Sequence, residues 1–178
     1  MRNRLITLAV VAAMALLVGC SAGSQQQGSI SSAASESASS AASELSAGTD
    51  SSEAYQLVVK DLIESEAYND LNSAAIAFLE DDPAERCANG DFASLRRDAD
   101  KLKELAAKLP KYDGKNATAI LAYQHAERYG QVVASSAEAF ATAKTVEDVE
   151  AATKLFGAGY DEAKELTKIV IQLREENE

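Results

Sequence analysis

The spacing of apolar residues predicts four amphipathic helices in the region 54–178. Apolar residues recur there at steps of three and four, which is the pattern of helices that bury one face. The expected helices cover residues 52–80, 92–109, 116–144 and 145–173. No stretch alternates strictly enough between apolar and polar residues to predict a strand. The pattern therefore predicts an all-α fold.

Turn and capping residues separate the first three helices. Pro83 ends the first helix because proline cannot continue the helical hydrogen-bond ladder. Asn89-Gly90 predicts a turn, and Asp91 directly after it is a suitable N-cap for the second helix. Pro110 ends the second helix in the same way as Pro83 ends the first.

Short connections between the helices favour an up-down antiparallel bundle of four helices. The last connection is the shortest, because Thr145 and Asp148 resemble a capping box that opens the fourth helix directly after the third. A three-helix bundle with a broken first element is the alternative.

Residues 21–53 have a different composition from the rest of the chain. Ser, Ala, Gly and Gln dominate, aromatic residues are absent, and Ile30 and Leu45 are the large aliphatic residues. Such a segment buries too little apolar surface to offset its ordering entropy, so we expect a disordered tether. Its expected end-to-end distance is roughly 30 Å.

The first twenty residues have the features of an export signal. Arg2 and Arg4 precede an apolar run over residues 5–18, which is too short to span a hydrocarbon core of about 30 Å. The run ends at Leu17-Val18-Gly19-Cys20, which resembles the bacterial lipobox. The resemblance implies cleavage between Gly19 and Cys20, a diacylglycerol on the Cys20 thiol and, in many family members, an acyl chain on the new amino group.

These features divide the chain into three expected parts. Residues 1–19 are the signal peptide, 20–53 the lipidated cysteine and linker, and 54–178 the helical bundle domain. The resemblance implies a protein anchored by lipid to the extracytoplasmic face of the cell membrane. Ser21 replaces the Asp that commonly retains lipoproteins in the inner membrane, so in a Gram-negative cell the outer membrane is expected. The long tether fits a single-membrane Gram-positive cell at least as well.

Charge and isolated reactive residues limit the chemistry of the domain. Removal of Arg2 and Arg4 takes the formal charge from −11 to about −13, which argues against nucleic acid as a partner. His125 is the one histidine, and it lies in no metal-binding or catalytic pattern. Cys87 is left without a second thiol once Cys20 carries lipid, so we expect either an inert buried residue or a disulfide-linked dimer. We therefore expect no enzyme, no metal site and no cofactor other than the lipid on Cys20.

Gly157 and Gly159 stand in the middle of the fourth helix, where each costs about 0.8–1 kcal/mol relative to alanine. We expect them to permit close helix packing or to mark a kink.

Two functions remain for the helical domain. The second helix has a heptad seam of the kind that specifies tight helix packing, formed by Phe92, Leu95, Ala99, Leu102, Ala106 and Leu109. This favours an interaction or structural module in the cell envelope, acting through another envelope protein or self-association. The alternative is a small-molecule-binding lipoprotein with a ligand between the helices. The candidate ligand or interface residues are Tyr123, His125, Tyr129 and Tyr160. An enclosed cavity bordered by these four favours a ligand, whereas a filled core with exposed Tyr and Leu residues on one face favours a protein partner.

Overall fold

The computed structural model describes residues 51–177, and these residues are helical with no strand among them. The signal peptide, the lipobox and the linker up to residue 50 lie outside the described residues. The helices are α3 (Ser51–Tyr55), η1 (Gln56–Ile63), α4 (Glu66–Glu80), α5 (Pro83–Ala88), α6 (Phe92–Ala107), α7 (Ala117–Thr142) and α8 (Val146–Asn177).

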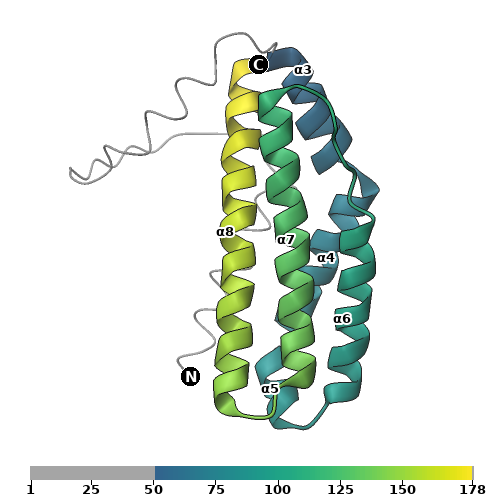
Figure 1. Cartoon of the computed structure of the whole chain (residues 1–178), viewed down its shortest axis with the longest axis vertical. Helices are drawn as coiled ribbons and strands as arrows, with labels where there is room; N and C mark the ends of the chain where they lie inside the picture. The colour runs from purple at the N-terminus through teal and green to yellow at the C-terminus, as the bar shows by residue number, and fades with distance from the viewer. Residues whose placement is uncertain (1–50, 178) are drawn as a thin grey trace, which may run out of the picture.

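The helices form an up-down bundle with four antiparallel arms, as the sequence predicts (Figure 1). The first arm consists of α3, η1 and α4, and the short α5 turns the chain at its lower end. The other arms are α6, α7 and α8, of which α7 packs against both α6 and α8. The first arm closes the bundle, because α4 contacts α6 and α3 contacts α8. The two ends of the described chain meet where Asn177 Nδ2 donates a hydrogen bond to the Ser51 carbonyl over 3.4 Å.

The first arm is not the continuous helix expected over residues 52–80. Its upper part widens into the π-helix η1, and the chain leaves helical geometry at Glu64 and Ser65. Ser65 has an extended backbone (φ −65°, ψ 145°), and its side chain accepts a hydrogen bond from the Tyr68 N–H over 3.2 Å. Ser65 is therefore the N-cap of α4 in the middle of what the apolar pattern presents as one helix.

The other helix ends lie within two residues of their expected positions, except that the fourth helix continues to Asn177, four residues beyond residue 173. The second helix ends at Ala107 rather than at residue 109, because Pro110 disfavours helical geometry in the residue that precedes it. The third helix ends at Thr142 rather than at residue 144. Its continuation is stopped by the predicted capping box, which is confirmed. The Asp148 carboxylate accepts from the Thr145 N–H over 2.9 Å, and the Asp148 N–H donates to Thr145 Oγ1 over 3.1 Å.

The core runs along the whole bundle axis. Phe78 packs against Phe140 and Phe156 at the end nearest α5, with its ring centroid 5.9 Å from that of Phe140 and 6.2 Å from that of Phe156. Fully buried aliphatic residues of η1 fill the opposite end. Ile120 on α7 follows the apolar spacing of that helix, yet 36% of its surface is exposed. Within residues 51–177 no helix is long and apolar enough to span a membrane.

Candidate functional site

Tyr129 is the most deeply buried of the four candidate residues. It has no exposed surface, and its hydroxyl donates a hydrogen bond over 3.1 Å to Oδ1 of Asn72, which is also buried. Its ring lies 6.3 Å from that of Tyr68, and burial raises the pKa of both phenols. Tyr129 therefore packs inside the bundle and faces no open site.

His125 lies one helical turn before Tyr129 on α7, at the seam between α7 and α8. Its Nδ1 lies 2.6 Å from Oε2 of Glu162, and Nε of Arg128 lies 3.5 Å from the same oxygen. The side chains of His125 and Glu162 are 15% and 25% exposed, so the pair is partly shielded from solvent. This cluster fastens α7 to α8.

Tyr123 and Tyr160 belong to neither of these groups. The Tyr123 hydroxyl donates to the carbonyl of Leu57 in η1 over 3.1 Å, and its ring packs against Tyr112 with centroids 5.4 Å apart. Burial raises the pKa of the Tyr123 phenol. Tyr160 is half-buried on α8. The structure thus places the four candidate residues at separate positions and does not bring them together around one cavity.

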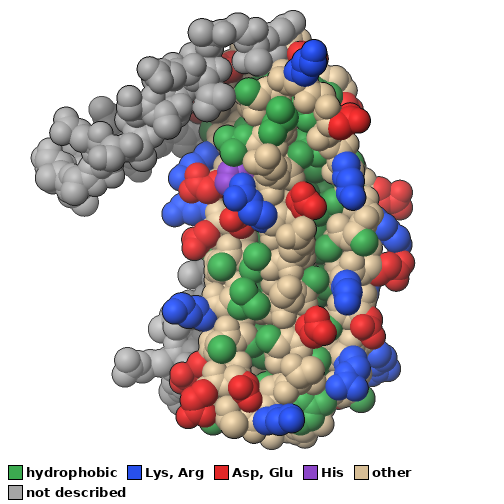
Figure 2. Space-filling view, viewed as in Figure 1, with side chains coloured by type: hydrophobic (Ala, Val, Ile, Leu, Met, Phe, Trp, Pro, Cys, Tyr) green, Lys and Arg blue, Asp and Glu red, His purple; other side chains and the backbone are tan. Residues whose placement is uncertain are grey.

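A groove of about 670 Å³ runs between α6 and α7 on the outer surface. Of the four candidate residues only Tyr123 lines it, near the end formed by Leu109, Pro110 and Tyr112. Apolar side chains reach the surface between charged ones on this face of the molecule (Figure 2). Two large apolar residues of α7 are exposed near the same end, Ile120 at 36% and Leu121 at 39%. The face formed by α6 and α7 is therefore the candidate functional surface.

Small residues form the bottom of this groove, which we call the groove floor and define as Ala99, Ala106, Ala134 and Ala141. The two helices approach closely there, since a Cβ added at Gly130 would lie 3.1 Å from the Cβ of Ala106. Within residues 51–177, no hydrogen bond or ion pair joins α6 to α7 across the groove. The groove is held open by helix packing alone.

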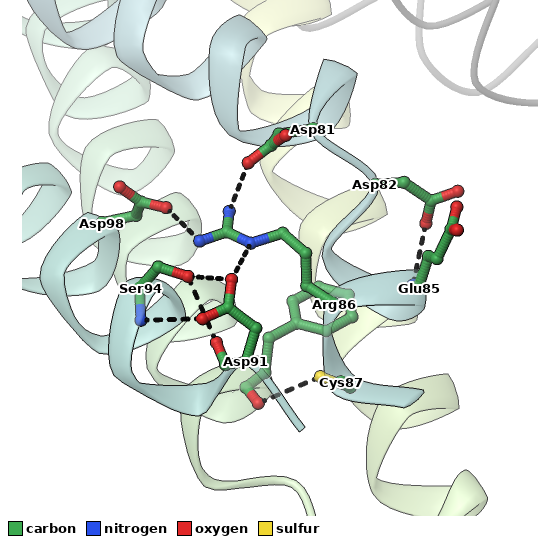
Figure 3. A network of polar contacts seen from close by, with 9 residues as sticks. Asp81, Asp82, Glu85, Arg86, Cys87, Asp91, Ser94 and Asp98 are labelled. Carbon is green, nitrogen blue, oxygen red and sulfur yellow. Dashed lines mark hydrogen bonds and ion pairs between the residues drawn. The ribbon is translucent and has the colours of Figure 1, made fainter. Parts of the chain in front are cut away.

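Arg86 on α5 anchors a second polar cluster at the lower end of the bundle (Figure 3). Its side chain is 11% exposed and its three nitrogens lie 3.0 Å from Asp81, 3.5 Å from Asp91 and 2.7 Å from Asp98. The carboxylates come from the end of α4, the turn before α6, and α6 itself. Because each contact connects a different segment, the cluster fixes the corner where the chain reverses from the first arm into α6.

The acidic residues of this corner also act as helix caps. Asp82 adopts a left-handed backbone (φ 43°) and accepts from the Glu85 N–H at the start of α5, where Pro83 occupies the first turn. Asp91 caps α6 by accepting from the Ser94 N–H over 3.4 Å, as the sequence predicts. Among the described residues, no group of three or more His, Cys, Asp or Glu side chains is arranged to hold a metal ion.

Cys87 is half-buried next to this corner. Its thiol donates to the Phe140 carbonyl over 3.3 Å, and burial raises its pKa. A raised pKa leaves less of the reactive thiolate at neutral pH. This environment favours the inert residue over the disulfide-linked dimer.

Sequence reasoning did not identify Asn72, Arg86 or Glu162. Asn72 carried a usable signal, because it is a polar residue within the apolar stripe of the first helix. The roles of Arg86 and Glu162 depend on partners from other helices, at Asp98 and His125, which a single sequence does not pair.

No protein-family model matches the chain, and neither a curated protein nor a solved structure shows significant similarity to it.

Proposed function

We propose that this chain is a bacterial lipoprotein, anchored to the extracytoplasmic face of a membrane through Cys20, whose helical bundle is an interaction module of the cell envelope. The anchoring part rests on the order Leu17-Val18-Gly19-Cys20 behind a short apolar run with a cationic start. Two or three acyl chains on one cysteine would hold the protein stably, since each buried CH₂ contributes about 0.8 kcal/mol.

The observation that carries the interaction role is a filled interior beneath an open α6–α7 face. Two polar side chains of the core have partners inside the bundle, since Tyr129 donates to Asn72 and Ser136 Oγ donates to the Ala152 carbonyl over 2.7 Å. The groove and the exposed residues Ile120 and Leu121 lie on the outer surface of this face. Val146 and Ile171, on α8, are also exposed but do not line the groove. A protein that presents apolar surface outside a packed core is suited to contact another macromolecule. The proposal includes no catalytic step.

Replacement of Cys20 tests the anchor. We expect Cys20→Ala to leave an uncleaved precursor without lipid, whereas Cys87→Ser, the matched control, keeps the mature lipidated mass and partitions with detergent. Intact-protein mass spectrometry and detergent phase partitioning of the protein from its native cells measure both. A Cys20→Ala protein with the same mature, lipidated mass would contradict the anchoring proposal.

Native mass spectrometry of the mature protein extracted from its own envelope tests the interaction role. A dimer, or a monomer with a stoichiometric protein partner, supports an interaction module. A monomer that reproducibly carries a small adduct would instead support the ligand-binding alternative and would give the mass of the ligand.

A further inference from the structure

The groove between α6 and α7 repeats every seven residues along both of its helices. On α6 the lining pairs are Arg96 with Lys103 and Ala99 with Ala106. On α7 the seven-residue spacing continues for longer, through Ile120, Glu127, Ala134 and Ala141 and through Gln124, Gln131 and Glu138. A repeat of seven is the spacing at which packed helices present equivalent side chains to one another. The groove is therefore built like the surface of a coiled coil that lacks one helix.

The length of the groove also matches the length of a helix. The lining residues on α7 extend from Ile120 to Thr142, which corresponds to roughly 30 Å at 1.5 Å per residue. That is the length of a helix of about twenty residues, or three heptads. The groove floor carries only alanine methyl groups, so a helix that packs on it closely must supply the large side chains.

The two sides of the groove carry opposite charge. We call Arg96, Lys103 and Lys111 the α6 wall, and Glu127 and Glu138 the α7 wall. Asp100 also lies on the α6 side, which therefore keeps an excess of positive charge. Within residues 51–177 the three cations of the α6 wall and Glu138 form no ion pair. Their charges remain available to an incoming partner.

From this geometry we infer that the groove binds one amphipathic helix of a partner protein. That helix carries large aliphatic residues toward the groove floor, acidic residues along the α6 wall and basic residues along the α7 wall. The inference rests on the proposed interaction role and assigns it a surface and a partner class. A second copy of this chain is a poorer occupant, because each copy carries a net charge of about −13 after signal removal, and the two would repel each other.

A designed three-heptad peptide is the probe for this groove. It has Leu at the two inward positions of each heptad, Glu on one flank and Lys on the other. A second peptide has Lys on both flanks. The protein is the mature polypeptide 20–178 carrying Cys20→Ser, and fluorescence anisotropy measures its affinity for each labelled peptide. Melting by circular dichroism verifies that every variant is folded.

Reversal of the α6 wall should exchange the preference between the two peptides. We expect R96E/K103E to weaken binding of the Glu/Lys peptide at least tenfold and to strengthen binding of the all-Lys peptide. The matched control is K154E/K164E, which makes the same charge change on the exposed face of α8 and should bind the Glu/Lys peptide as the wild type does. Amide chemical shifts should change along α6 and α7.

Several results would overturn the inference. These are the absence of saturable binding, an equal loss of affinity in K154E/K164E, or chemical shift changes confined to other helices. Self-association of the polypeptide that R96E/K103E abolishes would assign the groove to a second copy instead. If the native partner remains bound to R96E/K103E, the interaction role stands, but its assignment to the groove is wrong. The Cys20→Ala experiment tests the anchor independently of either outcome.

Discussion

At the scale of single residues, two buried tyrosines in the core differ in how their hydroxyls are satisfied. Tyr129 donates to Asn72, whereas no group within residues 51–177 accepts from or donates to the buried hydroxyl of Tyr68. When one partner of a buried hydrogen bond is removed, the other partner stays buried without a hydrogen bond, and this lowers the free energy of unfolding. Removal of a buried hydroxyl that has no partner leaves no such group behind. The two positions therefore form a matched pair with opposite expectations.

We predict that Tyr129→Phe lowers the free energy of unfolding by about 1–2 kcal/mol, because it leaves the Asn72 amide oxygen buried without a donor. Tyr68→Phe removes an unsatisfied hydroxyl and should leave stability unchanged or raise it. Urea denaturation followed by circular dichroism measures both variants. An equal loss in Tyr68→Phe would contradict this account and indicate a buried water bound to the Tyr68 hydroxyl.

The two glycines of α8 have different surroundings, although the sequence presents them as one feature. A Cβ added at Gly157 would meet no atom within 4 Å, whereas one at Gly159 would lie 3.2 Å from Cγ2 of Val133. Gly159 is buried and Gly157 is exposed. The expectation of close packing thus holds for Gly159 alone.

We predict that Gly157→Ala raises the free energy of unfolding by about 0.5–1 kcal/mol, because alanine loses less backbone entropy in a helix. Gly159→Ala gains the same helix propensity, but its added Cβ contacts Val133 and moves α8 away from α7. This variant should therefore be the less stable of the two. Thermal melting ranks them directly. If both glycines gave the same stabilisation, close approach of α7 and α8 would not depend on Gly159.

At the scale of whole elements, the start of α8 depends on a capping box that titrates. The N–H groups of Lys144 and Thr145 donate to Asp148 and lower the pKa of its carboxyl. Because the folded-state pKa lies below the unfolded one, the carboxylate stabilises the fold above the ordinary Asp pKa of about 3.9. That contribution is lost as the pH falls through the folded-state pKa.

We therefore predict that the melting temperature falls between pH 5 and pH 2 and that Asp148→Asn reduces this fall. Glu147→Gln, which removes the same charge at the neighbouring position, should keep the wild-type pH profile. Thr145→Ala removes the other half of the box and should cost about 1 kcal/mol at neutral pH. Identical pH profiles for Asp148→Asn and Glu147→Gln would show that the box does not govern acid stability at this helix.

The helices that the sequence predicted well are those whose ends carry chemistry that acts locally. Asp91, Pro110 and the Thr145–Asp148 box act on backbone groups within a few residues, so their effect can be read along the chain. The first arm was predicted less well because Ala67 follows the apolar spacing after Ile63 and hides the break. The structure instead buries Tyr68, one position later, and half-exposes Ala67. Ser65 is of a residue type that favours N-caps, but the apolar spacing runs past it without interruption.

The candidate site shows the same division between local and long-range information. The sequence identified Tyr123, but periodicity alone does not say which helix packs beside which face. The groove exists because α6 and α7 are neighbours, a fact set by packing across more than one helix. The partners of His125 and Arg86 could not be predicted from the sequence for the same reason.

At the scale of the whole molecule, the described chain is part of the bundle from Ser51 onward, and an N-terminal extension of fifty residues precedes Ser51 in the sequence. The first arm belongs fully to the bundle, since Val58, Val59 and Leu62 of η1 have no exposed surface. Burial of each such side chain contributes roughly 1.5–3 kcal/mol. Together with Ile63, which is 5% exposed, they contribute an amount comparable with the entire stability of about 5–15 kcal/mol of a typical domain.

Two truncations separate the roles of the extension and the first arm. Removal of residues 1–50 should leave the melting temperature within about 2 °C of that of the mature polypeptide, since a shift of this size corresponds to less than 1 kcal/mol. Removal of residues 1–64 takes away α3 and η1, uncovers the faces of α7 and α8 beneath them, and should abolish the cooperative transition. Scanning calorimetry of both proteins at neutral pH makes the comparison. A cooperative transition that survives removal of residues 1–64 would show that α4 to α8 fold without the upper half of the first arm, and would favour a smaller bundle as the folding unit.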